Sequence, residues 1–482
     1  MGIVADRRTF LAGLGAACLS PASSQSLAQD DLTRLDAWLT ALHPGLYRYQ
    51  TQADYRRRLH GLRTSWRTAP SLEQRFLALS RFTATIRCGH TFCNPNNQSD
   101  AVAARLFESR RLVPLRFRWI GQQMIVVKDA WTRGIDRGTE VLSIDGVSAS
   151  RIQSTLLNCT RADGHNSAKQ RSLLSVEGHD RFETFDIFHP LLFPGSGPFR
   201  LSLRDTKGRK RYVSLDPIDR AQRLAVHRKS PDRSATDPWW TFERKGRAAV
   251  LTMPDWGIYD TKWEWKSWLE QRFTELAASD AKGLVIDLRG NEGGIDIGDH
   301  IIAHLVREPL APFAYRRRTR FQSVPDGLRT GLNTWDKDFF TLGMKGQPVD
   351  GGYFELPGAK EGPTSMLQPK APFFGGKVAV LIDSANSSAT NRFAARVQEK
   401  RLATLVGRET GGNQRGINGG AFFFATLPES GLEFDLPLIG TFPPTPKPDR
   451  GIVPEVAVPL TGSAIASGRD EAMQCALEIV LT

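Results

Sequence analysis

The sequence predicts an α/β fold that is preceded by a helical region and a β-rich region. Three observations predict it. Apolar residues first recur at helical spacing, the period changes to two from about residue 112, and strands alternate with helices from about residue 241. Such alternation favours a sheet covered by helices on both faces. The 482 residues are enough for about three domains.

Residues 1–28 have the pattern of an export signal. Arg7-Arg8 precedes a short apolar run, and Ser26-Leu27-Ala28 forms a small-x-small cleavage pattern. Paired arginines are typical of a twin-arginine signal, so we expect a periplasmic protein cleaved after Ala28. A lipoprotein site at Cys18 is the less favoured alternative. The apolar run is too short to cross a bilayer, and we expect no transmembrane segment after signal removal.

The remaining cysteines and the charge restrict the classes of partner. Beyond the signal the cysteines are Cys88, Cys93, Cys159 and Cys475, and a Cys88–Cys93 bridge is plausible in an oxidising compartment. The Cys88–Cys93 segment lacks a fourth ligand at a familiar spacing, so we expect no metal. No nucleotide motif is present, and no cofactor is expected. The net charge is +13, yet the arginine run at 316–320 is typical of a solvated strand or loop, so no nucleic-acid partner is expected.

Residues 29–95 are predicted to form a helical domain of three helices. Each helix shows an apolar stripe, and Ser71 with Gln74 resembles a capping box. The stripes are Leu32, Leu35, Leu39 and Leu42, then Tyr55, Leu59, Leu62 and Trp66, then Leu72, Phe76, Leu79 and Phe82.

Residues 100–222 are predicted to form a β-rich domain. Its segment 134–146 resembles the PDZ stretch G-x-E-V-L-x-I-x-G, which implies binding of an extended peptide at a sheet edge. A long segment, 150–196, interrupts the compact PDZ order. Residues 223–240 are polar and are predicted to be a linker.

In residues 241–482, two loops at the ends of buried strands carry the candidate chemistry. Predicted strands cover 248–253, 283–287, 377–382 and 403–406, and predicted helices cover 261–278, 295–306 and 389–399. The glycines of Asp287-Leu-Arg-Gly-Asn-Glu-Gly-Gly294 suit an oxyanion hole, although a structural turn would explain them equally well when taken alone. Ser388 at a helix start could equally be a cap.

Together these motifs resemble the C-terminal processing, or tail-specific, serine peptidases. The family pattern D-L-R-x-N-x-G-G is matched by 287–294, the S-A-S-E element partly by 388–391, the L-V-G-x-x-T-x-G element by 405–412, and the closing element by 449–459. The resemblance implies a crotonase-like catalytic domain. It also implies that Ser388 is the nucleophile, Gly293 and Ala389 form the oxyanion hole, and Gly294 and Asn291 contact substrate.

One departure from the family changes the expected base. The family lysine follows the serine by about 25 residues, where this chain has Asn413 and Gln414, and neither is a base at neutral pH. His90, in Cys88-Gly-His-Thr91, resembles the base of the lysine-less branch related to the tricorn protease core. A carboxylate is then expected to orient His90 or to hold its loop, with Asp449 the first choice and Glu455 the second.

The sequence therefore predicts an exported serine-type peptidase that cleaves peptides or unfolded chains through an acyl-enzyme, using Ser–His chemistry. The alternative is a catalytically inactive, peptide-binding envelope protein, for which Asn413 in place of lysine is the main support.

Overall fold

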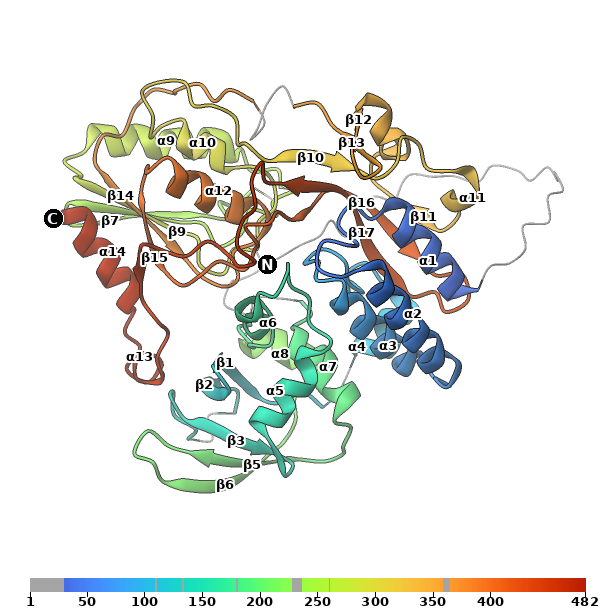
Figure 1. The fold of residues 1–482 in the computed structure, drawn as a ribbon. Coiled ribbons are helices and arrows are strands. Elements are labelled where there is room, and N and C mark those ends of the chain that lie inside the picture. Colours follow the sequence, from blue (N-terminus) through green and yellow to red (C-terminus); the bar gives the residue numbers. More distant parts are fainter. Residues whose placement is uncertain are drawn as a thin grey trace.

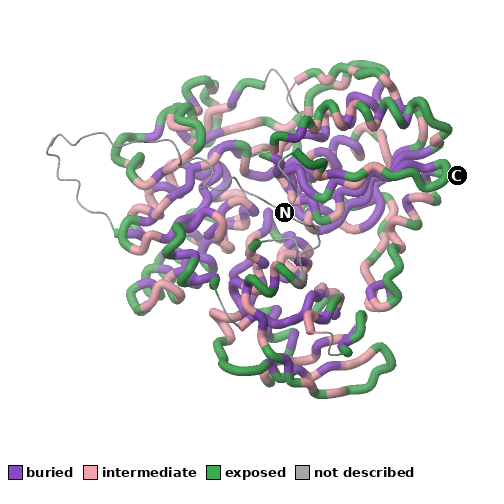
Figure 2. Tube along the Cα trace, turned by 180° about the vertical axis from the view of Figure 1, so that it is seen from behind, coloured by how far each residue is buried: buried purple, intermediate pink, exposed green. Residues whose placement is uncertain are grey.

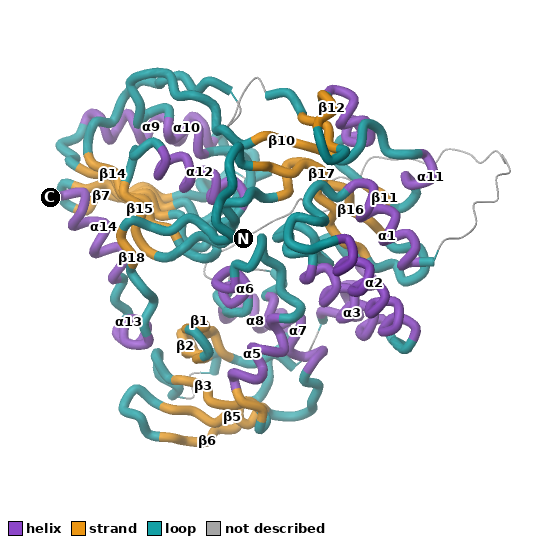
Figure 3. Tube along the Cα trace, in the orientation of Figure 1, coloured by secondary structure: helices purple, strands orange, loops and turns teal. Residues whose placement is uncertain are grey.

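The computed structural model describes residues 30–108, 111–131, 134–178, 181–227, 236–259, 261–358 and 365–482. The predicted signal, including Cys18, lies outside these residues. Within them the chain forms three six-stranded sheets with helices around them (Figures 1 and 3). No helix in this part of the chain is long and apolar enough to cross a membrane.

The helical region contains α1 (Asp31–Leu42), α2 (Gln52–Arg67), α3 (Leu72–Thr85) and α4 (Asp100–Phe107). Side-chain caps begin these helices, because each first turn has backbone N–H groups without helical partners. Thr51 and Asp54 form a full capping box, whereas Ser71 contributes only the Ser-side bond to the backbone of Gln74. The three predicted helices are thus confirmed.

The middle region is an antiparallel sheet with a helical insertion. Its strands are β1 (Leu115–Ile120), β2 (Gln123–Asp129), β3 (Glu140–Ile144), β4 (Val147–Ser148), β5 (Phe199–Arg204) and β6 (Lys210–Leu215). Helices α5 (Ala149–Leu157), α6 (Ser167–Leu173) and α7 (Thr184–Leu192) lie between β4 and β5. Helix α8 (Arg220–His227) occupies the start of the predicted linker, so that part of the chain is helical.

The mostly parallel sheet has the order β18-β15-β14-β9-β8-β7. Strands β8 (Ala248–Thr252), β9 (Gly283–Asp287), β14 (Lys377–Ile382), β15 (Thr404–Gly407) and β18 (Val456–Ala457) run parallel, and β7 (Thr241–Lys245) pairs antiparallel at the edge. Figure 2 shows the buried residues gathered along these strands.

Helices cover both faces of this sheet, as the strand–helix alternation predicts. One set of alternate strand residues, including Leu251 and Ile286, packs with α9 (Trp265–Ala278), α10 (Gly298–Ile302) and α12 (Ser388–Glu399). The other set, including Val250 and Val285, packs against α14 (Glu471–Leu481), which follows the short α13 (Gly462–Ser467). The helix predicted at 295–306 is shorter than expected, because the glycine loop extends to residue 297 before it begins.

The third sheet was not anticipated from the sequence. Its order is β11-β16-β17-β10-β13-β12, and its long strands are β16 (Asn418–Thr426) and β17 (Glu433–Phe442). The shorter strands are β10 (Arg316–Thr319), β11 (Leu332–Asn333), β12 (Gln347–Val349) and β13 (Tyr353–Glu355), with α11 (Asp326–Arg329) and the 3₁₀ helix Lys337–Lys345 between them.

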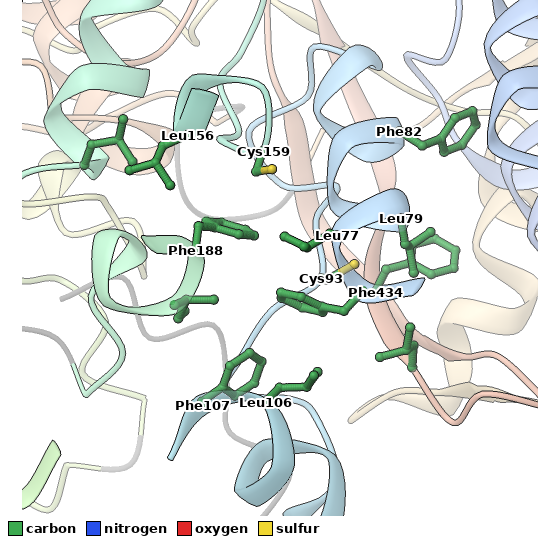
Figure 4. Packing of buried hydrophobic residues seen from close by; sticks show 14 of the residues in the cluster. Leu77, Leu79, Phe82, Cys93, Leu106, Phe107, Leu156, Cys159, Phe188 and Phe434 are labelled. Carbon is green, nitrogen blue, oxygen red and sulfur yellow. The ribbon is translucent and has the colours of Figure 1, made fainter. Parts of the chain in front are cut away.

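One hydrophobic core joins this third sheet to the helical and middle regions. Phe434 from β17 packs with Leu79 from α3, and the same cluster includes Phe107 and Phe188 (Figure 4). The core therefore crosses the predicted domain boundaries, and the helical region is anchored to strands more than 300 residues away in sequence.

Burial of a neutral histidine in the middle region makes stability depend on pH. His189 stacks on Phe185 at 4.8 Å, and burial lowers the pKa of His189 to about 4. Since the unfolded state takes up a proton below the ordinary value of about 6.5, this contribution is present at neutral pH and is lost as the pH falls toward about 4.

When the pH falls from about 7.5 to about 5, the free energy of unfolding of the wild type should drop because of His189. In His189→Phe we expect this drop to be smaller by about 2 kcal/mol. Urea midpoints at the two pH values measure the difference. His60→Phe, on the exposed side of α2, is the matched control and should keep the wild-type pH dependence. Equal pH dependence in the His189 variant and the wild type would contradict the inference that His189 is buried in its neutral form.

Candidate active site

Two loops meet at the carboxyl ends of β9 and β14, which are adjacent parallel strands. The Asn386 side-chain amide joins them by donating to the carbonyl oxygens of Leu288 (2.6 Å) and Asn291 (2.9 Å). Its Oδ1 accepts from the backbone N–H of Asp383 at 2.7 Å. These bonds bring the glycine loop against the start of α12.

Ser388 is the first residue of α12, and its backbone adopts an unusual conformation. Its φ of +51° lies in the left-handed region, which non-glycine residues rarely adopt. The side chain is half-buried, and within the described residues its hydroxyl makes no hydrogen bond. The preceding Ser387, by contrast, donates its hydroxyl to the carbonyl of Glu292 at 2.9 Å. Of the two serines, only Ser388 is therefore available for chemistry.

Gly293 and Gly294 permit close approach of the two loops. A Cβ on Gly293 would lie 2.8 Å from Cβ of Ser388 and 2.9 Å from the backbone nitrogen of Ala389. A Cβ on Gly294 would lie 2.1 Å from the carbonyl oxygen of Trp256. Both glycines have positive φ values, +103° and +140°. The Ala389 N–H belongs to the first turn of α12, where backbone donors have no partner inside the helix.

Asn291 occupies a structural position in this state. Its side chain is fully buried and donates to the carbonyl of Met253 at 2.8 Å. Its Oδ1 accepts from the N–H of Gly293 at 2.9 Å. The Gly293 donor expected in an oxyanion hole is thus engaged by Asn291, and it must exchange that bond to serve a substrate.

His90 lies in the loop that follows α3, next to β16. A Cβ on Gly419 would be 3.8 Å from its Nε2, and its ring centre is 5.7 Å from that of Phe422. Nδ1 is buried without a hydrogen-bond partner among the described residues. Burial lowers the pKa of His90 to about 3, and the positive charges of Arg161 and Lys169 act in the same direction. The imidazole is therefore neutral at pH 7.

The loop around His90 is held by its neighbours in sequence. Oγ1 of the fully buried Thr91 is 2.8 Å from Nε2 of His43, and the N–H of Gly89 donates to Oδ1 of Asp163 at 2.8 Å. The N–H of Asp435 in β17 donates to the carbonyl of Phe92 at 3.0 Å.

One arginine spans the His90 loop and the glycine loop. Arg161 donates to the carbonyl of Gly89 at 3.0 Å and to Oε2 of Glu292 at 2.9 Å. Gly89 precedes His90, and Glu292 precedes Gly293, which packs on Ser388. Arg161 therefore links the loop that carries His90 to the loop that packs on Ser388, and no hydrogen bond joins the side chains of His90 and Ser388 within the described part of the chain.

Asp449 contacts the His90 loop through intermediates. Its Oδ2 is 2.6 Å from Nδ1 of His165, and its Oδ1 accepts from Asn413 Nδ2 at 2.7 Å. The same Nδ2 lies 3.2 Å from the carbonyl of Asp163, whose carboxylate receives the Gly89 N–H. Burial acts to raise the pKa of Asp449, yet the hydrogen bonds from His165 and Asn413 hold it below its usual value.

Glu455 lies away from this network. Its carboxylate accepts from the side chain of Gln398 and from the N–H of Leu405. It fixes β15 to α12 and makes no hydrogen bond to the His90 loop within the described residues.

The expected Cys88–Cys93 bridge is not formed, and both thiols are free and buried. Sγ of Cys88 accepts from Asn418 at 3.3 Å. Cys93 and Cys159 (Figure 4) belong to the same hydrophobic core as Cys88. Cys88 and Cys93 are therefore both core residues, and both thiols are free.

Sequence patterns did not reveal Arg161, Lys169 or Glu292 as parts of the site. Glu292 lies inside the recognised glycine motif, at a position that the pattern leaves unspecified. Arg161 and Lys169 lie in the insertion of the middle region, where no motif marks them. A single sequence carries no signal that pairs them with Glu292 across more than 120 residues.

Residues 247–423 match peptidase family S41. Among solved structures, a mutant of CPAF is similar over 94% of this chain and 96% of its own, with 15% identity and a TM-score of 0.66. Mature CPAF in complex with lactacystin is also 15% identical, covers 93% and 96% of the two chains, and has a TM-score of 0.62. The photosystem II D1 C-terminal processing protease is 14% identical over 92% of this chain and 97% of its own, with a TM-score of 0.41. No curated protein matches the chain significantly.

Because a side chain at Gly293 would collide with Ser388 and Ala389, substitution of this glycine is a test of the site. Gly293→Ala would place a Cβ against Ser388, and we expect it to lower peptidase activity by about 100-fold or more, because Ser388 and Ala389 must move. Peptide cleavage and the urea midpoint measure the two consequences separately.

Gly290→Ala is the matched control. Gly290 also has a positive φ, +82°, yet a Cβ there meets nothing within 4 Å. Both variants incur the backbone cost of about 1–3 kcal/mol, but Gly290→Ala should keep most of the activity. Equal activity losses in the two variants would contradict a specific role for the Gly293–Ser388 contact.

Proposed function

From the premise that residues 247–423 form a peptidase family S41 domain, which makes the chain a serine-type peptidase, we propose that Ser388 is its nucleophile and His90 its general base. The proposed substrates are peptides or unfolded protein chains. The observation that carries the proposal is the left-handed conformation of Ser388 at the start of α12, where its Cβ lies against Gly293 and its hydroxyl makes no hydrogen bond within the described residues.

The proposed reaction proceeds in two halves. Ser388 Oγ attacks the peptide carbonyl while His90 takes its proton, and the oxyanion is stabilised by backbone N–H groups of Ala389 and Gly293. His90 then delivers the proton to the leaving amine, which departs and leaves an acyl-enzyme. A water molecule, deprotonated by His90, hydrolyses the ester and releases the new carboxyl end.

Two features of the site determine what substrate binding must do. No hydrogen bond joins Ser388 and His90 within the described residues, and catalytic bonds of this kind are often formed only in the substrate complex. Gly293 must also release its N–H from Asn291 Oδ1. We therefore propose that the substrate completes the site and contacts Gly294, and that Asn291, expected from the sequence to contact substrate, supports the glycine loop from its buried position instead.

Asp449 is proposed to hold the His90 loop rather than the imidazole itself. The supporting contacts run from Asp449 through Asn413 to Asp163, and from Asp163 to the N–H of Gly89. Asn413 would then replace the family lysine as a structural link, which explains why a residue without basic character is compatible with activity.

Further parts of the proposal concern export and substrate presentation. The N-terminal pattern supports twin-arginine export to the periplasm. The resemblance of 134–146 to a PDZ stretch supports peptide binding by the middle region. The alternative function is that of an inactive peptide-binding envelope protein, which the missing family lysine favours.

Labelling of the purified protein with a fluorophosphonate separates the two functions. We expect an adduct on Ser388, its loss in Ser388→Ala, and at least about a 100-fold slower reaction in His90→Ala. Ser384→Ala, in the same loop, and His60→Ala, on the surface of α2, are the controls and should react as the wild type does.

Mass spectrometry of the adduct and cleavage of an unfolded protein are the two measurements. No adduct on Ser388, together with peptide binding that Ser388→Ala leaves intact and no cleavage on long incubation, would establish the inactive alternative. An adduct that forms equally fast in His90→Ala would remove His90 as the base.

A further inference from the structure

A buried charged cluster lies behind the two catalytic loops. We name Arg161, Lys169 and Glu292 the Glu292 cluster. Lys169 Nζ donates to Glu292 Oε1 at 2.7 Å and to the carbonyl of Ala385 at 2.8 Å. The side chain of Lys169 is 3% exposed, that of Glu292 15% and that of Arg161 18%.

The cluster contacts each part of the proposed site through a neighbouring residue. Arg161 bonds to the carbonyl of Gly89, next to His90. Glu292 itself precedes Gly293 of the glycine loop. Lys169 bonds to the carbonyl of Ala385, in the loop that leads to Ser388. Both cations come from the insertion of the middle region, so three segments of the chain meet at one carboxylate.

Stability alone is a weak reason for such a cluster. Burial of a lysine removes it from water, and a buried ion pair often contributes no more than apolar packing of the same volume. The described residues hold a comparable pair in Arg223 and Asp186, whose side chains are 3% and 10% exposed. That pair lies within the middle region, where Arg223 also bonds the carbonyls of Val113 and Leu115, and it does not bond the loops of the proposed site.

The charges of the cluster do not cancel. Within the cluster two cations face one carboxylate, and the carboxylates of Asp163 and Asp383 act on the same cations from outside it. A positive charge beside the proposed base and oxyanion hole disfavours a protonated imidazole and favours a developing oxyanion. Glu292 limits both effects, because its negative charge lies between the two cations.

We propose that Arg161, Lys169 and Glu292 are positioning residues that fix the His90 loop against the nucleophile loop and set the electrostatic field for proton transfer. This inference rests on the proposed Ser388–His90 chemistry and goes beyond it by assigning a role to the middle region in the reaction itself.

The sign of the field is testable because its sources have opposite charge. The charged groups that act on His90 are Arg161, Lys169 and Arg392, which lower its pKa, and Glu292, which raises it. Removal of Lys169 should therefore raise the pKa of His90, and removal of the Glu292 charge should lower it. A group that only supported folding would not produce opposite shifts.

The experiment measures the rate of fluorophosphonate labelling of Ser388 in the full chain as a function of pH. The acidic limb is the part of the profile where the labelling rate falls at low pH. In Lys169→Met this limb should move up by about one pH unit, whereas in Lys169→Arg, which keeps the charge, it should stay at the wild-type position. In Glu292→Gln the limb should move down, and the plateau rate should fall because the loops lose their common partner. Arg223→Met is the matched control: it breaks a buried ion pair, and its limb should stay at the wild-type position.

If Lys169→Met does not fold, as judged by its urea midpoint, Arg161→Gln removes a charge of the same sign at a more exposed position. An unmoved limb in a folded charge-removing variant, or the same shift in Arg223→Met, would overturn the inference. Those outcomes leave the proposed function intact as long as the wild type is labelled and His90→Ala is slow. Absence of labelling in the wild type would instead refute the proposed function.

Discussion

The arrangement of the site depends on one buried amide. Asn386 donates two hydrogen bonds to carbonyl oxygens of the glycine loop, and these join the two loops at the end of the sheet. Its oxygen accepts a backbone N–H from its own loop, which holds the side chain in place. An aspartate could not donate these bonds, and an apolar side chain would leave buried carbonyl groups unsatisfied. The close approach of Gly293 to Ser388 follows from this link, because the two loops leave their strands side by side and Asn386 then closes the gap.

The strain at Ser388 persists because its surroundings determine the backbone path. A non-glycine residue in the left-handed region costs about 1–3 kcal/mol. Thr390 opposes that cost by bonding its hydroxyl to the carbonyls of Asn291 and Ser387, and Ser387 is itself bonded to Glu292. The loop before Ser388 and the helix after it are thus both tied to the glycine loop. Local strain and a free hydroxyl are produced by the same set of contacts.

The sequence predicted those parts of the protein in which local patterns decide the structure. The helices from 31 to 85 and the buried strands around residues 285 and 380 have clear periodicity, and both catalytic-domain loops follow from where those strands end. The third sheet was missed because β16 and β17 join short strands from 316–355 and pack on α1, and such long-range partners leave no periodic signal. The free state of Cys88 and Cys93 was missed for the same reason. Asn418, which donates to the Cys88 sulfur, and the core around both cysteines come from distant parts of the sequence.

Side-chain partners were the least predictable part of the site. A carboxylate near residue 449 was expected, yet its contact with His165 depends on a surface loop of the middle region that the sequence leaves unassigned. Arg161 and Lys169 come from the insertion that looked like an interruption of a compact domain. A histidine 298 residues before the serine needs more than its own loop to hold it in register, and the insertion supplies that contact.

In the Ser–His chemistry that we propose, the Glu292 carboxylate would balance two requirements. The transition state holds a positive imidazolium and a negative oxyanion at the same time, so a cation that stabilises one destabilises the other. Two uncompensated cations would make proton uptake by His90 too unfavourable, and an uncompensated carboxylate beside Gly293 would oppose the oxyanion. With Lys169 on the nucleophile side and Arg161 on the His90 side, Glu292 offsets each cation where it acts.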